Sequence, residues 1–193
     1  MMQNSFFSMI SRMKHINRWG LMRNTWRETL SEHSLDVAVI AYGLAVIGNT
    51  RLQKEYDCDR ASVLGIYHDA SEIITGDLPT PVKYHNEEIK QAYKKVEGVA
   101  NQALLDMIPE DMKSCYQHLF IKSEEDAPLW KLVKAADKIS AYIKCLEEES
   151  AGNQEFLKAK QTLHDSIVNL CLPEADIFIN EFLPSFTKTL DEQ

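Results

Sequence analysis

The sequence predicts an all-α protein built as one domain over residues 1–193. Three observations carry this prediction. With 193 residues the chain is long enough for one sizeable hydrophobic core, and domains typically span ~100–200 residues. The composition is 45% hydrophobic and 26% charged with only 7 Gly and 6 Pro, which is rich in helix formers and poor in turn formers. Finally, apolar residues recur at helical spacing along most of the chain.

The first half of the chain predicts three helices. Apolar side chains favour a first helix over residues 2–15. The second begins after Thr29, which forms a capping box pattern with Glu32, or after Ser31, and it ends near residues 48–49. A third is expected from Asp59 to about Gly76, the residue suited to end it.

Residues 77–81 contain two prolines, so they predict a stiff, extended loop rather than helix. Five further helices follow from the apolar pattern and from prolines suited to first turns. They are expected over residues 86–107, from Pro109 to Phe120, from Asp126 or Pro128 to Gly152, and over residues 153–170 and 174–190. Pro184 is expected to kink the last one.

Charge and cysteine usage exclude several functional classes. A formal charge of -8 with few Lys/Arg clusters argues against a nucleic-acid polymer as partner, although a small anion can bind a local basic pocket. The four cysteines are widely spaced with no CxxC pair, so we expect reduced thiols and a cytoplasmic protein. The apolar run 6–10 is too short for a signal peptide or membrane span, so neither export nor membrane insertion is expected.

Four hard ligands, His33, His68, Asp69 and Asp137, are embedded in apolar helical patterns. Moving an uncompensated carboxylate out of water costs several kcal/mol or shifts its pKa. Two acids and two imidazoles directed at one core therefore suggest a shared divalent cation. The sequence predicts one metal rather than a pair, because the ligand runs contain no additional histidines.

Each ligand taken singly has a simpler explanation. A lone histidine is more often satisfied by a backbone carbonyl than by a metal. Asp137 lies on the apolar stripe between Val133 and Ser140, and a buried salt bridge to Lys134 or Lys138 explains it as well as a metal does. Only the four residues together favour the metal.

The spacing of these four residues resembles the H…HD…D signature of the HD-domain metal-dependent phosphohydrolases, an all-helical superfamily in which they bind a divalent metal. The surrounding runs resemble, more narrowly, the bacterial 5'-deoxynucleotidase family over nearly the whole chain. These runs are Asn17-Arg18-Trp19, residues 31–35, 67–72 and 75–84, Ala136-Asp137, residues 142–148 and Pro184-Ser185-Phe186. One departure is Gly20, where we expect proline; glycine is expected to loosen that loop without removing a reacting group.

Glu72 is the candidate catalytic acid or base. It follows His68 by four residues and Asp69 by three, so on a continuous helix it lies one turn along, beside both ligands. It can then reach a metal-bound water. The alternative is a solvated helix glutamate, but the resemblance also implies a catalytic glutamate at this position.

Arg18 and Trp19 are candidate substrate contacts, since a guanidinium can grip phosphate oxygens and an indole can form a wall for the sugar or base. Without the resemblance, a surface arginine beside a core tryptophan explains them better. The resemblance implies that the pair orients phosphate and sugar, that the loop beginning at Asp77 completes the nucleotide pocket, and that a crowded wall at the 2' position excludes ribonucleotides. The Asp77 carboxylate can accept a hydrogen bond from a sugar hydroxyl. The implied substrate contacts are Arg18, Trp19, His33, Asp69, Asp77, Leu78, Pro79, Thr80 and Asp137.

The expected reaction is hydrolysis of a deoxyribonucleoside 5'-monophosphate, with Glu72 and Arg18 as catalytic residues. The resemblance favours Co²⁺ or Mn²⁺, while the ligand set also suits Zn²⁺ or Fe²⁺, and it implies a homodimer. One alternative is an HD hydrolase of deoxynucleoside triphosphates or signalling nucleotides, which needs a basic channel; the sequence offers only Arg18 with Arg23 or Lys83. Another is a non-catalytic helical adaptor stabilised by metal.

Overall fold

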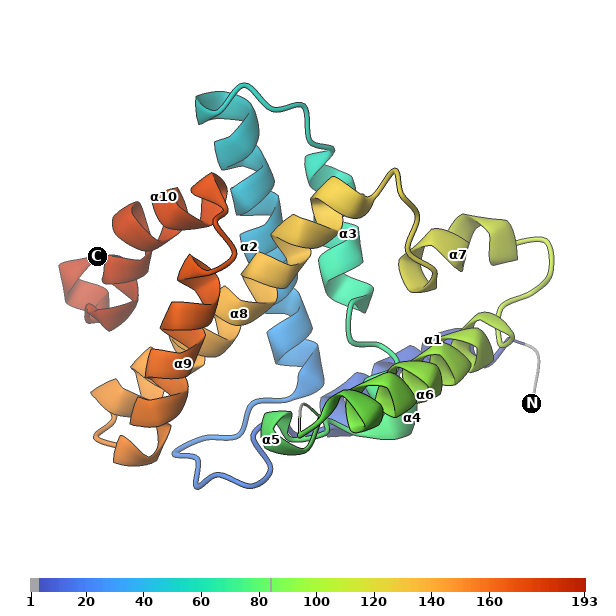
Figure 1. Cartoon of the computed structure of the whole chain (residues 1–193), viewed down its shortest axis with the longest axis horizontal. Helices are drawn as coiled ribbons and strands as arrows, with labels where there is room; N and C mark the ends of the chain where they lie inside the picture. The colour runs from blue at the N-terminus through green and yellow to red at the C-terminus, as the bar shows by residue number, and fades with distance from the viewer. Residues whose placement is uncertain (1–3, 84) are drawn as a thin grey trace.

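The computed structural model describes residues 4–83 and 85–193, and over these residues it is helical, as predicted (Figure 1). One isolated antiparallel bridge joins Asn17 to Thr29. The α-helices are α1 (Phe6–Ile10), α2 (Leu30–Arg51), α3 (Cys58–Tyr67), α4 (Glu72–Thr75), α5 (Thr80–Lys83), α6 (Glu87–Leu105), α7 (Lys113–Phe120), α8 (Ala127–Ser150), α9 (Leu157–Val168) and α10 (Pro173–Glu181). The 3₁₀ helices are η1 (Ser11–His15), η2 (Gln154–Phe156), η3 (Leu183–Thr187) and η4 (Leu190–Glu192).

The core forms where α2, α3 and α8 pack on one another, with α8 crossing α2 (Figure 1). α2 carries no charged residue between Asp36 and Arg51, and its Val37, Ala41 and Leu44 are fully buried. The helix begins with the predicted capping box, in which the Thr29 hydroxyl accepts the Glu32 amide proton. This packing brings the first turn of α2, the end of α3 and the middle of α8 together.

Glycine permits the close approach of α3 to α2. A Cβ added to Gly65 would lie 2.8 Å from the Cα atom of Ala38, so a larger residue there would push the two helices apart. Because His33 and His68 belong to these two segments, the separation of the helices also sets the separation of the histidines.

α2 is also the one helix in the described part of the chain that is long and apolar enough to cross a membrane, judged by length and composition alone. More than half of its most apolar window is buried inside the protein. Its apolar character is therefore explained by its place in the core.

The third helix differs from its prediction. Asp57, not Asp59, caps α3, by accepting the Arg60 amide proton at 2.9 Å. The helix stops at Tyr67, and residues 68–71 form a turn before α4. The reason lies in His68, whose Nδ1 donates to the Gly65 carbonyl oxygen at 2.8 Å, the acceptor that a continued helix would offer to the next amide.

Three other segments correct the predicted elements. Residues 80–83 form the short helix α5, with Pro81 in its first turn, where a missing amide proton costs nothing. At the C-terminal end the expected kinked helix is instead two elements: α10 ends at Glu181, and Pro184 lies in the first turn of the 3₁₀ helix η3, which begins at Leu183. The first predicted helix is divided into α1 and η1, and residues 2 and 3 lie outside the described range.

Candidate metal centre and substrate pocket

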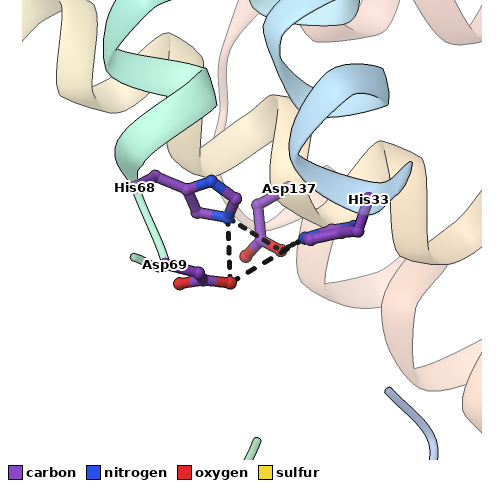
Figure 2. Close-up of side chains that lie close together, drawn as sticks. All are labelled: His33, His68, Asp69 and Asp137. Carbon is purple, nitrogen blue, oxygen red and sulfur yellow. Dashed lines mark hydrogen bonds and ion pairs between the residues drawn. The ribbon is translucent and has the colours of Figure 1, made fainter. Parts of the chain in front are cut away.

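His33, His68, Asp69 and Asp137 come together as predicted, with one ligand atom of each within 4.8 Å of the others. Figure 2 shows the four side chains directed at one another from α2, the turn after α3, and α8. His33 Nε2 lies 3.1 Å from Asp137 Oδ1, and His68 Nε2 lies 3.0 Å from Asp69 Oδ2. Two imidazole nitrogens and two carboxylate oxygens thus converge on one point.

Asp137 lies at the open edge of this cluster rather than in the core, since its side chain is 38% exposed whereas that of His33 is fully buried. Its ion-pair partners in the described residues are His33 and His68. Lys138 donates instead to the Ser166 hydroxyl. The lysine salt bridge considered from the sequence is therefore wrong.

The second nitrogen of each histidine is held by the protein. His68 Nδ1 faces the Gly65 carbonyl oxygen, and His33 Nδ1 lies 3.1 Å from Ser140 Oγ and 3.6 Å from Glu28 Oε1. A carbonyl only accepts, so His68 carries a proton on Nδ1, whereas the hydroxyl of Ser140 beside His33 Nδ1 can donate or accept. Both Nε2 atoms face the cluster, and that of His68 has no hydrogen-bond partner in the described structure. This donor set fits a divalent metal of the Mn²⁺-to-Zn²⁺ series.

The two acids of the cluster are held ionised without a metal. Burial by itself raises the pKa of Asp69, but the neighbouring His68, His33 and Arg18 outweigh it and hold the pKa well below its usual range. The pKa of Asp137 is lowered in the same way by His33. Burial lowers the pKa of His68, yet the charge of Asp69 prevails and raises it to about 9. A bound cation would replace that proton.

Glu72 is buried at 4% exposure, so the solvated-glutamate alternative is wrong. The turn at 68–71 interrupts the continuous helix predicted from the sequence. Glu72 nevertheless lies close enough to Asp69 for the charge of Asp69 to affect its pKa. Burial first, and then the charges of Asp69 and Asp77, raise the pKa of Glu72 to about 9. Its Oε2 has no hydrogen-bond partner in the described structure. Burial and the neighbouring carboxylates therefore favour the neutral form of Glu72.

Arg18 is not a surface arginine, since its side chain is only 12% exposed. Its Nη1 lies 3.7 Å from Asp69 Oδ2, and its Nε lies 3.6 Å from Glu28 Oε2. These distances are too long for strong hydrogen bonds, and the buried Nε has no partner in the part of the chain described. The guanidinium therefore keeps donors available for an anion beside Asp69.

Trp19 and Asp77 connect two loops beside Arg18. The Trp19 indole donates to Glu28 Oε2 at 2.6 Å, and it packs against Phe156 with the two ring centroids 5.3 Å apart. The Trp19 backbone amide donates to the carboxylate of Asp77, whose pKa is nevertheless raised because the group is half-buried. The Arg18–Trp19 loop and the Asp77 loop therefore form one wall.

The remaining residues predicted for the pocket are placed as follows. Leu78 and Pro79 are half-buried in the same loop, and Thr80 begins α5, although its side chain lies outside the described structure. Gly20 is exposed, with open space around it. Arg23 pairs with Glu155, and its side chain is 93% exposed. Lys83 pairs with Glu97 at 2.8 Å, and its charge acts on Glu72.

Sequence reasoning missed Glu28, which touches His33, Arg18 and Trp19. Its only signal was position: it immediately precedes the N-cap residue of the helix that carries His33. Ser140 was read as part of the core stripe of α8, and the structure adds its contact with His33.

Comparisons with known proteins agree with this geometry. The family described as 5'-deoxynucleotidase YfbR-like matches residues 5–186. The chain belongs to this family. The chain is 47% identical over 192 residues to a 5'-deoxynucleotidase of Erwinia tasmaniensis, covering 100% of this chain and 97% of the relative. It is 49% identical over 191 residues to one of Yersinia pseudotuberculosis, covering 97% of this chain and 95% of the relative. The family resemblance seen in the sequence is confirmed.

Solved structures show the same fold. An HD-domain phosphohydrolase of Listeria innocua superposes with a TM-score of 0.83 at 22% identity, covering 94% of this chain and 88% of that chain. The HD phosphohydrolase of cyanophage S-2L, solved with dA and one catalytic Zn²⁺ ion, superposes with a TM-score of 0.66 at 18% identity, covering 94% of this chain and 96% of that one. The predicted HD-domain helical fold is confirmed.

Proposed function

We propose that this protein is a phosphoric monoester hydrolase that converts deoxyribonucleoside 5'-monophosphates to deoxynucleoside and inorganic phosphate. The observation that carries the proposal is the arrangement around Asp69. The four-ligand cluster lies on one side of it, while Arg18 Nε and Glu72 Oε2 are buried nearby with no hydrogen-bond partner in the described structure. Full-length relatives named 5'-deoxynucleotidase support the choice of substrate.

One divalent ion held by His33, His68, Asp69 and Asp137 would offset phosphate charge and acidify a water molecule. Co²⁺ and Mn²⁺ are the ions we favour, with Zn²⁺ and Fe²⁺ also suited to the ligands. Zn²⁺ is the ion named for the cyanophage protein of the same fold.

The chain's own residues then divide the work. Arg18 directs guanidinium donors at the phosphoryl oxygens from beside Asp69. Glu72 either orients the attacking water or, as the protonated acid its raised pKa allows, donates a proton to the departing 5' oxygen. Trp19, Asp77, Leu78, Pro79 and Thr80 hold the sugar, with Asp77 accepting a hydrogen bond from its hydroxyl and the 2' side too crowded for a ribonucleotide.

A phosphate-release assay tests the proposal. The protein is stripped with chelator, reloaded with Co²⁺, Mn²⁺, Zn²⁺ or Fe²⁺ singly, and given matched deoxy- and ribonucleoside 5'-monophosphates. We expect activity only after metal is restored, and only on the deoxy series. Equal rates on ribonucleotides would overturn the sugar preference. Release of diphosphate or triphosphate from longer nucleotides, with no cleavage of monophosphates, would overturn the reaction.

We also propose that the chain acts as a single-domain, cytoplasmic homodimer without membrane attachment. Support for the dimer comes from α2, which carries Leu35, Val39 and Tyr42 on one face at 62%, 63% and 44% exposure. Gly43 beside them has open space for a second helix. Sedimentation velocity tests this: a dimer that Val39→Asp converts to a folded monomer is expected, and a monomeric wild type would contradict it.

A further inference from the structure

Glu28 lies between the metal cluster and the substrate pocket. It is buried at 8% exposure and immediately precedes Thr29, the N-cap residue of α2. Its backbone carbonyl accepts the Arg18 amide proton at 2.9 Å, and the Leu30 amide donates to the Ile16 carbonyl at 2.9 Å. These two bonds fix residues 16–18 alongside residues 28–30. The pairing of these two backbone segments thus places Arg18 and His33 beside the Glu28 carboxylate.

The two oxygens of that carboxylate face different parts of the site. Oε2 accepts the Trp19 indole proton at 2.6 Å and lies 3.6 Å from Arg18 Nε. Oε1 lies 3.6 Å from His33 Nδ1. One buried group therefore touches a metal ligand and both residues that we assign to phosphate and sugar.

Physical chemistry gives each contact a consequence. The negative charge of Oε1, 3.6 Å from His33 Nδ1, favours a proton on that nitrogen and so favours the Nε2 lone pair for the metal; the Ser140 hydroxyl lies closer, at 3.1 Å. An anion beside Arg18 Nε limits the positions its guanidinium can adopt, without occupying the donors with a short hydrogen bond. The short bond to Trp19 fixes the indole plane. The carboxylate suits the two donors on its other oxygen, the Trp19 indole N–H and the Arg18 guanidinium.

We propose that Glu28 is a positioning residue that aligns His33 for the metal and, with the same carboxylate, Arg18 and Trp19 for the substrate. The substrate half rests on the function proposed above, whereas the metal half depends only on the cluster. Loss of the carboxylate charge is therefore expected to weaken metal binding and substrate binding together.

Glu28→Gln tests this, because glutamine keeps the shape and one acceptor oxygen but supplies no charge. Glu124→Gln is the matched control, because it makes the same chemical change at an exposed glutamate that lies outside the contacts described for Glu28. Co²⁺ is titrated into stripped protein and followed by its visible absorption. KM and kcat for a deoxynucleoside monophosphate are then measured at saturating Co²⁺.

For Glu28→Gln we expect Co²⁺ affinity to fall about 10–100-fold, as is typical when the partner of a ligating histidine is changed. At saturating Co²⁺, KM is expected to rise about tenfold while kcat changes less, because positioning rather than chemistry is lost. Glu124→Gln should match the wild type in both measurements. Wild-type Co²⁺ affinity and KM in Glu28→Gln would overturn the proposal.

Glu28→Asp keeps the charge but shortens the side chain, so it is measured as well in case the glutamine variant does not fold. It is expected to recover part of the Co²⁺ affinity, and Co²⁺ binding and KM indistinguishable from wild type in this variant would count against a geometric role. If the wild type releases no phosphate from any nucleotide while Glu28→Gln still weakens Co²⁺ binding, the proposed function fails and the alignment of His33 stands.

Discussion

Two buried glutamates, Glu148 and Glu72, differ in what surrounds them. Glu148, fully buried on α8, accepts hydrogen bonds from the Thr25 amide and hydroxyl at 3.0 and 2.8 Å and from Asn153 Nδ2 at 2.7 Å. It also pairs with Lys144. Glu72 is buried to nearly the same degree, yet its Oε2 has no hydrogen-bond partner among the described residues.

The pKa values record the difference. Burial pushes both upward, but the donors around Glu148, led by Lys144, lower its pKa to about 2. Glu72 instead faces Asp69 and Asp77, which add to burial and raise its pKa to about 9. A buried acid with a complete set of donors holds the fold together, here by joining the loop containing Thr25 to α8. An acid buried without them fits a partner that is not part of the chain.

Two arginines repeat the contrast. Arg60 forms a forked pair with the buried Asp126, with Nη2 2.8 Å from Oδ2. Arg18 reaches its two carboxylates only at 3.6 and 3.7 Å. Arg60 thus joins α3 to the start of α8, while Arg18 keeps donors free beside the cluster.

The largest effect is expected from removing one of the four residues that would hold the metal. Asp137→Asn should abolish detectable phosphate release and Co²⁺ binding while the fold survives, because Asp137 lies at the solvent-exposed edge. Co²⁺ titration and circular dichroism measure this, with the exposed Asp165→Asn as control. An Asp137→Asn protein that bound Co²⁺ like wild type would break the comparison, since the cluster would then not be a metal site.

Glu72→Gln should lower kcat about 10²–10⁴-fold, the usual contribution of a positioned acid or base. Co²⁺ affinity should stay within a few-fold of wild type, because Glu72 lies outside the four-ligand cluster. Steady-state kinetics at saturating Co²⁺ check this. The exposed Glu125→Gln is the control and should turn over normally. Full activity in Glu72→Gln would show that Glu72 is neither the catalytic acid nor the catalytic base.

Glu148→Gln should leave kcat per folded molecule nearly unchanged but destabilise the protein by about 3 kcal/mol, because Lys144 is left buried without its partner. The charge of Glu148 contributes stability above its unfolded pKa of 4.5, and this is lost as pH falls toward the folded value of about 2. In urea unfolding, the difference in the free energy of unfolding between wild type and Glu148→Gln should therefore become smaller below pH 4.5. A difference independent of pH would be evidence against the ion pair.

The smallest effect is the pH dependence that Glu72 gives to the stability of the metal-free protein. Its sign is opposite to that of Glu148. The folded pKa of Glu72, about 9, exceeds the unfolded 4.5, so its stabilising contribution is lost as pH rises between those values. From pH 6 to 7.5, the free energy of unfolding of the wild type should fall by about 2 kcal/mol relative to that of Glu72→Gln, since one pH unit corresponds to ~1.4 kcal/mol per proton. Urea unfolding in chelator measures this, and parallel pH profiles would contradict it.

The sequence by itself determined the all-helical class, the capping box at Thr29 and the four ligands of the cluster. Helical periodicity and capping depend on residues three or four apart, which are neighbours in the chain, so they can be read directly. The ligands were found because hard polar groups on apolar stripes are costly without a common partner. Family resemblance, rather than spacing, supplied the reaction.

Only the tertiary structure decided which polar side chains around the cluster have hydrogen-bond partners. The turn at 68–71 depends on the His68 ring reaching a backbone carbonyl, and the site contacts of Glu28 depend on two chain segments pairing side by side. The opposite pKa shifts of Glu72 and Glu148 arise from donors and charges distant in sequence. A residue's type is local, but the number of its hydrogen-bond partners is fixed only when segments far apart in the chain pack together.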